Sequence, residues 1–584
     1  MGGDVPWTFL AVTVAVAVAA PSVAASTTAS KTNGKVLKHG YLGRTEGAFS
    51  ETVPKDGPKV KTKSGTVEGL ASGKAQIFYG IPYAAPPIKA GRWKAPGSPT
   101  PWKGVYNATY PRAACMQSCR GPFGAPAENR NCPVKLSEDC LYLNIFVPLD
   151  VNFTAPPAKL LPVMVWVHGG DFIAGTASNP MYDGRFLASS THTIIVNVEY
   201  RLGVFGFLVT GTDPEKSATG NYGILDQQAA LIWVQQNIAG FGGDPSKVTI
   251  FGESSGSQSV GLHLMVESSG PLFNQAIMQS LPFTVPLKSK HEALKLGKDF
   301  AEIANCTSTD MSCLLSLTPE KVLAAQIGAG RKILNPFKFL EKFQTWGPFI
   351  DGTLIGEQIT PAFRMGHWQK EKPVILGTTS EEGVMFVYGA FKKPMSLLEC
   401  TACATAIFKQ YALLVLYKYL PHYPEEDRRK LLSQTVTDYV FLCSSRKSAR
   451  AAVKDGSAVW LYVFDHVTSD LRVWGDVTFC YDHVCHSAEL PFVFSSFSMR
   501  NFTFTAEEQL LANQIVCYWG RFSHSGNPNA EGDQTEFCCQ QKLPSWPEYT
   551  DRGHWLHMNL TTGSHSQMGY RDDFCNFWDT LDIY

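Results

Sequence analysis

The chain has 584 residues, of which 44% are hydrophobic and 17% charged, so it can bury a large core and does not resemble a disordered polypeptide. The 51 basic and 51 acidic side chains cancel, which leaves no basic stripe for a phosphate backbone and excludes nucleic acid as an expected partner. The length suits several average domains or one large α/β enzyme.

The N-terminal residues predict a cleaved signal peptide over residues 1–25. An apolar segment runs from Phe9 to Ala20 and is followed by small residues that resemble a signal-peptidase site. The segment is short for a bilayer span, although no basic residue precedes it, so an uncleaved anchor remains an alternative. Residues 26–58 are polar and lack periodicity. We therefore expect a polar leader there and a single enzyme domain over residues 59–584.

Strand-like apolar runs alternate with helical segments along that domain. Runs buried on both faces and separated by helices, such as Leu225–Asn237, are typical of an α/β fold with a large, mostly parallel sheet and helices on both sides. No later stretch has the length and purity of a membrane span, so we expect none in the mature chain. The expected strands are Val163–Val167, Ile194–Val198, Val248–Phe251, Val374–Leu376 and Val459–Phe464.

Cysteines and glycosylation sequons both indicate the secretory pathway and an extracellular protein. Several of the 15 cysteines stand at short spacings that an oxidising compartment would bond: Cys115/Cys119, Cys306/Cys313, Cys400/Cys403 and Cys480/Cys485. Zinc is disfavoured because no two C-x-x-C pairs stand at ribbon spacing, so we expect no metal and no cofactor. N-x-[ST] sequons occur at Asn107, Asn152, Asn305, Asn501 and Asn559.

The pentapeptide Gly252-Glu253-Ser254-Ser255-Gly256 predicts a nucleophilic serine. It follows the expected strand Val248–Phe251 and opens a stretch that can form a helix. A G-x-S-x-G sequence between a strand and a helix holds its serine on a sharp, strained turn with the hydroxyl exposed. Ser254 is therefore the candidate nucleophile.

A serine nucleophile needs a base and a group that orients the base, and in α/β-hydrolases these follow in the order serine, acid, histidine. Glu382 comes shortly after the expected strand Val374–Leu376, and His486 comes about twenty residues after Val459–Phe464. From the residues alone, Glu381 and His483 remain alternatives to them.

From about Val60 to Trp578 the chain resembles the type-B carboxylesterase and cholinesterase family. The resemblance implies an α/β-hydrolase fold, with Ser254 as nucleophile, Glu382 as acid and His486 as base. It makes Glu381 and His483 bystanders. The motifs that carry it, in order, are Phe78–Ala84, Ser137–Asn144, Tyr200–Gly203, Phe241–Pro245 and the Ser254 turn.

The segment His168–Phe172 resembles the family's His-Gly-Gly-Gly loop, which supplies backbone donors to an oxyanion hole. The resemblance implies that the donors are the N–H groups of Gly170, Asp171 and Ser255. Asp171 replaces the third glycine, and Ser255 stands where the family usually has alanine. We expect the Asp171 side chain to turn away from the nucleophile, so that only its N–H faces the oxygen.

The resemblance also implies disulfides and a structural ion pair. The family pattern pairs Cys115 with Cys140, Cys306 with Cys313 and Cys443 with Cys517, while Cys119/Cys132 and Cys480/Cys485 look like additions. It further implies a buried ion pair between Arg92 and Glu138. Because 15 is odd, at least one thiol stays without an intrachain partner among Cys400, Cys403, Cys538, Cys539 and Cys575.

The substrate is expected to be a small uncharged ester. In the cholinesterase branch a tryptophan in the loop closed by the first disulfide binds quaternary ammonium. The loop Met116–Asp139 of this chain has no tryptophan, and Arg130 lies near the expected place. We therefore predict a secreted general carboxylic ester hydrolase. The alternatives are a catalytically inactive adhesion or receptor domain and an interfacial lipase, and the oligomeric state is not indicated.

Overall fold

The computed structural model describes residues 57–118, 133–154, 159–330, 340, 344–532, 535–550 and 556–584. The predicted signal peptide, most of the polar leader, Arg130 and the Cys119/Cys132 pair lie outside these residues. Residues from Pro54 to Tyr584 form one compact unit.

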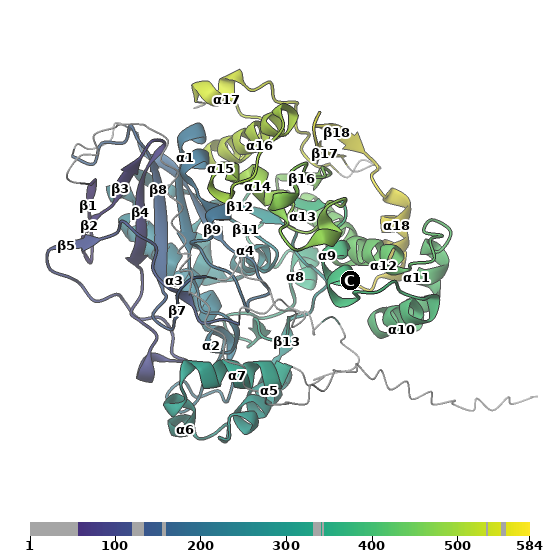
Figure 1. The fold of residues 1–584 in the computed structure, drawn as a ribbon, viewed down its shortest axis with the longest axis horizontal. Helices are drawn as coiled ribbons and strands as arrows, with labels where there is room; N and C mark the ends of the chain where they lie inside the picture. The colour runs from purple at the N-terminus through teal and green to yellow at the C-terminus, as the bar shows by residue number, and fades with distance from the viewer. Residues whose placement is uncertain are drawn as a thin grey trace, which may run out of the picture. The chain divides into compact units, whose positions relative to one another are not determined.

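An eleven-stranded sheet runs through this unit (Figure 1). Its order from one edge to the other is β18 (His565–Met568), β17 (Leu556–Leu560), β16 (Val459–Phe464), β15 (Val374–Thr379), β12 (Gln275–Gln279), β11 (Gly243–Glu253), β9 (Leu161–Val167), β10 (Ile194–Val198), β8 (Tyr142–Pro148), β4 (Ala75–Pro82) and β3 (Leu70–Ser72).

The strands from β10 to β17 in this order all run parallel, and the pairings outside them are antiparallel. The predicted α/β-hydrolase fold is confirmed, and each of the five predicted strand runs lies within a strand of the sheet. Short strands outside the sheet are β1 (Lys59–Thr62), β2 (Gly65–Glu68), β5 (Val105–Asn107), β6 (Ala114–Cys115), β7 (Leu136–Ser137), β13 (Lys288–Ser289) and β14 (Phe349–Ile350).

Helices lie on both faces of the sheet, and the predicted helix Leu225–Asn237 lies within α3. They are α1 (Arg185–Thr191), α2 (Gly203–Phe207), α3 (Tyr222–Asn237), α4 (Ser255–Met265), α5 (Lys290–Ile303), α6 (Met311–Ser316), α7 (Pro319–Gly330), α8 (Ile359–Met365), α9 (Gly383–Ala390), α10 (Leu397–Phe408), α11 (Ala412–Tyr419), α12 (Arg429–Val436), α13 (Cys443–Lys454), α14 (Leu490–Val493), α15 (Phe497–Arg500), α16 (Ala506–Ser525), α17 (Glu536–Gln540) and α18 (Asp572–Leu581).

Alternating side chains of each central strand enter two separate cores. In β9, Val163, Val165 and Val167 face one core with α3 and α4, whereas Met164 and Trp166 face a second core with α1 and α16. This follows from the two-residue period of a strand. Because both faces are covered, the strands read as continuous apolar runs, which explains why the sequence identified them.

One apolar helical stretch departs from the expectation that no later segment could span a membrane. Leu397–Tyr419 has the length and composition of a span. It consists of α10 and α11, which are separated by a turn at Lys409, where φ is +54°. Side chains of both helices, including Phe408 and Val415, are buried in the core. In Figure 1 these helices lie beside α12 and α18, apart from the group formed by α5, α6 and α7.

The disulfides correct one predicted pairing. Cys115–Cys140, Cys306–Cys313 and Cys480–Cys485 form as predicted. The predicted Cys443–Cys517 bond is wrong, because Cys443 bonds Cys575 and Cys517 bonds Cys538, with Cα atoms 4.9 and 5.5 Å apart. The two cysteines of the predicted bond lie on opposite faces of the sheet. Cys443 begins α13 and belongs to the first core, whereas Cys517 lies on α16, which packs in the second core.

The short-spacing expectations also need correction at two places. Cys115 bonds Cys140 and not Cys119, and Cys400 and Cys403 are both free thiols. The implied ion pair is present, with Arg92 Nη2 2.6 Å from Glu138 Oε2.

Of the five asparagines predicted as glycosylation sites, Asn559 is too buried to carry a glycan. Its side chain lies in β17, is 9% exposed and donates a hydrogen bond to Gln567. The other four asparagines are exposed.

Candidate active site

Ser254 lies at the sharp turn between β11 and α4. Its backbone has φ +57° and ψ −125°, a strained conformation for a residue other than glycine. The turn ends the strand at Glu253 and starts the helix at Ser255. The side chain of Ser254 is 9% exposed and lines a cavity.

The two glycines of the pentapeptide are required by the neighbouring strand. A Cβ atom on Gly256 would lie 2.0 Å from the carbonyl oxygen of Val167, and one on Gly252 would lie 2.7 Å from the same oxygen. Both distances are far inside van der Waals contact. The glycines therefore allow β9 to approach the turn, which brings the loop after β9 next to Ser254.

Glu382 and His486 meet at the carboxyl ends of the parallel strands. Glu382 follows β15 and is fully buried, and its Oε2 lies 2.5 Å from Nδ1 of His486. Its Oε1 accepts a hydrogen bond of 2.8 Å from the N–H of Thr379. The carboxylate is therefore fixed at both oxygens and holds the imidazole in one orientation, with Nε2 left for another partner.

Glu381 and His483 form a second pair beside the first. Nδ1 of His483 lies 2.8 Å from Glu381 Oε1, and the N–H of Val484 donates to Oε2 of the same carboxylate. Both side chains are about a quarter exposed, at 29% and 26%. The structure therefore pairs Glu382 with His486 and keeps Glu381 and His483 together in a separate pair.

Nε2 of His486 faces a carboxylate that the sequence reasoning did not single out. It lies 3.0 Å from Oε1 of Glu253, the residue before the nucleophile, and the structure records no hydrogen bond between it and Ser254. Catalytic hydrogen bonds of this kind often tighten only when substrate is bound. Burial lowers the pKa of His486, but the carboxylates of Glu253 and Glu382 outweigh burial and raise it.

Three further features of this site were missed from sequence. Glu253 was quoted only as part of the serine motif, although its position next to Ser254 was a usable signal. The centres of the Phe386 and Phe441 rings lie 5.1 and 5.3 Å from the centre of the His486 ring, so both phenylalanines pack against the imidazole. Nothing in the sequence pattern distinguishes these two from the other 33 phenylalanines.

The loop after β9 brings backbone donors to the nucleophile. Gly170 has φ +116° and Asp171 has φ +55°. A Cβ atom on Gly169 would lie 3.1 Å from Cβ of Ser254, so the loop packs directly against the serine. Within the described residues, no acceptor is recorded for the N–H groups of Gly170, Asp171 and Ser255. These donors are available to a developing oxyanion.

The Asp171 side chain shares the cavity with Ser254. It is partly buried, and no hydrogen-bond partner is recorded for its carboxyl group in the described part of the chain. Burial raises the pKa of Asp171 to about 7, the nearby imidazole of His486 lowers it and the carboxylate of Glu253 raises it further.

The cavity beside Ser254 has a volume of about 730 Å³ including its open mouth, and its wall is almost entirely apolar. Among the described residues that line it, Asp171 is the one with a carboxyl group, and none has a cationic side chain. Most of the apolar wall comes from α9, α10, α12 and the turn of helix that follows α12: Phe386, Val387, Ala390, Cys403, Ile407, Leu432, Val436, Val440 and Phe441.

A strained serine, an imidazole oriented by a buried carboxylate and three unpaired backbone donors are the parts needed for acyl transfer. Comparison with family profiles matches residues 56–578 to the carboxylesterase family.

Three curated relatives cover most of the chain. The crystal protein of Dictyostelium discoideum is 38% identical and covers 81% of this chain and 82% of its own length. Acetylcholinesterase of Bungarus fasciatus is 35% identical, and cholinesterase of Mus musculus is 33% identical. Each of these two covers 89% of this chain and 86% of its own length.

Proposed function

The chain belongs to the carboxylesterase family and is a carboxylic ester hydrolase, and we propose that it is a secreted serine esterase that cleaves uncharged esters through an acyl-enzyme on Ser254. The observation that carries the proposal is the Glu382–His486 contact, whose imidazole packs against Phe386 and Phe441 of the cavity that Ser254 lines. The five disulfides among the described residues support the secretory route.

The proposed reaction has two halves. The hydroxyl oxygen of Ser254 attacks the ester carbonyl while Nε2 of His486 takes its proton, and the carbonyl oxygen becomes an oxyanion held by the N–H groups of Gly170, Asp171 and Ser255. The imidazolium then protonates the departing alcohol. Water attacks the acyl-serine in the same way, and the carboxylic acid leaves. Glu382 stabilises the imidazolium in both halves without being protonated.

An uncharged substrate fits the cavity best. Its apolar wall favours hydrocarbon groups, because apolar area removed from water contributes about 25 cal/mol per Å². The carboxyl groups of Asp171 and Glu253 near the reaction centre disfavour an anionic substrate. A cation would find a carboxyl group, but its desolvation in an apolar cavity opposes binding.

Comparison of a choline ester with its uncharged isostere tests this preference. We expect kcat/KM for 3,3-dimethylbutyl thioacetate to exceed that for acetylthiocholine by at least about tenfold, which corresponds to about 1.4 kcal/mol. The two esters have nearly the same shape, so the difference reports the charge. Faster hydrolysis of acetylthiocholine would place the chain with the cholinesterases.

Hydrolysis assays with p-nitrophenyl esters test the two remaining alternatives, an inactive adhesion domain and an interfacial lipase. An inactive adhesion domain would hydrolyse neither thioester nor p-nitrophenyl acetate. An interfacial lipase would show a jump in rate when p-nitrophenyl octanoate passes its solubility limit, because such enzymes act at a lipid surface. We expect saturation below that limit and no jump.

Asp171 gives a prediction about pH. Below a pKa of about 7 its carboxyl group is neutral, and above that pH it is an anion. A unit charge about 5 Å from the oxyanion costs about 3 kcal/mol at an effective dielectric of about 20, which is on the order of a hundredfold in rate. We therefore expect the parent enzyme to lose activity relative to Asp171→Gly as pH rises from 6 to 9.

The measurement is the ratio of kcat for parent and variant on p-nitrophenyl acetate at each pH. At pH 6 the variant should stay within about tenfold of the parent, because glycine keeps the backbone donor. A loss beyond about a hundredfold at pH 6 would show that the carboxyl group itself takes part in catalysis. A ratio independent of pH would show that the charge does not reach the oxyanion.

A further inference from the structure

A π-helical segment, η7 (Thr437–Leu442), joins α12 to α13 and forms part of the cavity wall. Val440 and Phe441 line the cavity, and the ring of Phe441 also lies 5.3 Å from the ring of His486. A π-helix is rare and is found mostly as a single turn at functional sites. Because α-helical geometry is the default, the surrounding structure must hold this segment in place.

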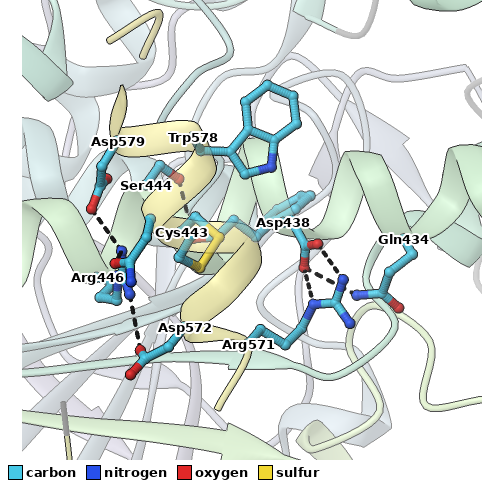
Figure 2. The surroundings of a disulfide bond; sticks show 12 residues. Gln434, Asp438, Cys443, Ser444, Arg446, Arg571, Asp572, Trp578 and Asp579 are labelled. Carbon is cyan, nitrogen blue, oxygen red and sulfur yellow. Dashed lines mark hydrogen bonds and ion pairs between the residues drawn. A yellow bond between two sulfur atoms is a disulfide. The ribbon is translucent and has the colours of Figure 1, made fainter. Parts of the chain in front are cut away.

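The opposite side of η7 is bound to α18 by a buried ion pair (Figure 2). Asp438 is fully buried, and Arg571 at the start of α18 donates to both of its oxygens at 2.6 Å. Tyr419 and Gln434 donate to the same carboxylate at 2.6 and 3.1 Å. The charge of Asp438 is thus fully satisfied, and the two parallel bonds from Arg571 fix the direction of the side chain.

Two more contacts tie the neighbouring residues to the same C-terminal segment. Cys443, the residue after η7, bonds Cys575 of α18, as Figure 2 shows. The hydroxyl of Tyr439 donates to the carbonyl of Ile583 at 2.8 Å, and its ring lies 5.0 Å from that of Trp578. Residues on one side of η7 therefore contact α18, and those on the other side contact the cavity and His486.

We propose that α18 is a positioning element for the substrate cavity, which holds η7 so that Val440 and Phe441 set the preference for ester chain length. The proposal rests on the proposed function, since it takes the cavity beside Ser254 as the substrate site. A short acetate ester reaches only the nucleophile end of the cavity. A longer acyl chain extends along the wall and gains from its packing only when that wall is ordered.

Arg446 provides a matched control for Arg571. It lies on α13, is fully buried and binds Asp572, Asn576 and Asp579 on α18 at 2.6 to 3.0 Å, as Figure 2 shows in part. It therefore ties α13 to the same C-terminal helix with comparable contacts, and among the described residues its side chain has no recorded contact with η7 and does not line the cavity. Removal of either arginine breaks a buried ionic contact and should lower the melting temperature.

The experiment compares Arg571→Gln with Arg446→Gln well below their melting temperatures. The readout is kcat/KM for p-nitrophenyl octanoate divided by that for the acetate. We expect Arg571→Gln to lower this ratio at least about fivefold, mainly through KM for octanoate, with acetate kcat within about threefold of the parent. Arg446→Gln should leave the ratio within about twofold. An unchanged ratio in Arg571→Gln, or equal changes in both variants, would overturn the proposal.

Tyr439→Phe covers the case in which Arg571→Gln does not fold. It removes one hydroxyl and its bond to Ile583, keeps the ring and should lower the ratio about twofold. An unchanged ratio here would also count against the proposal. If the parent hydrolyses neither ester, the proposed function fails and this inference with it, whereas activity on both esters with unchanged ratios rejects only the role of α18.

Discussion

Replacement of Ser254 by alanine should lower kcat for p-nitrophenyl acetate by about 10⁴-fold or more, because the acyl-enzyme can no longer form. The same variant should lose covalent labelling by an organophosphate, which reacts with the activated serine. Folding should be unaffected, since alanine can adopt the backbone conformation of serine and the Ser254 side chain makes no capping hydrogen bond to α4. Mass spectrometry of the labelled protein and steady-state kinetics check the two results.

Ser257→Ala is a suitable control for this variant. Ser257 lies one turn further along α4 and is fully buried, and it is not among the described residues that line the cavity, so we expect the reaction not to need its hydroxyl. Its variant should be labelled and hydrolyse esters as the parent does. Labelling of Ser254→Ala at another serine would mean that the nucleophile lies elsewhere.

Replacement of His486 by alanine should lower kcat on the order of 10⁴-fold, because Ser254 then has no base. Glu382→Gln should lower kcat by about 10³- to 10⁴-fold, since an amide can neither orient the imidazole in the same tautomer nor stabilise its positive charge. Both variants should still bind substrate, so KM should change much less than kcat. Burst kinetics would locate the loss in acylation.

The neighbouring pair supplies matched controls for these two variants. His483→Ala removes an imidazole three residues from His486, and Glu381→Gln removes a carboxylate next to Glu382. The hydrogen bonds recorded for these two side chains in the described structure join them to each other and to the N–H of Val484. Each variant should stay within a few-fold of the parent. If His483→Ala proved as damaging as His486→Ala, the register of the proposed base would be wrong by three residues.

Local signals explain which parts of the fold could be predicted from the sequence. The strands of the parallel sheet are buried on both faces and therefore appear as apolar runs, and the Ser254 turn is marked by the two glycines that β9 requires. In both cases the sequence feature is a run of a few neighbouring residues, so it can be recognised without knowledge of the distant segment that requires it. Ser254 and Glu382 of the proposed triad follow strand ends directly, whereas His486 comes about twenty residues after β16 and was suggested by chain order.

Features that depend on distant contacts could not be predicted in this way. The pairing of Cys443 with Cys575 joins residues 132 positions apart, and nothing in the spacing favours it over Cys517. The raised pKa of Asp171 depends on burial beside His486 and Glu253. Asn559 is buried because it lies in β17, between β16 and β18. The sequon pattern alone could not predict that burial.

The bond between Cys443 and Cys575 also has a consequence for the order in which the molecule is made. At a synthesis rate of about 5–20 residues per second, the chain from one cysteine to the other, a separation of 132 positions, takes on the order of ten seconds to emerge. During that time Ser254, Glu382 and His486 have all left the ribosome, yet η7 lacks the partners that α18 provides. A nascent chain therefore carries its reactive groups before the wall beside them is finished. The helix α18 does not line the cavity itself, so its arrival supplies the contacts that support η7 behind the wall.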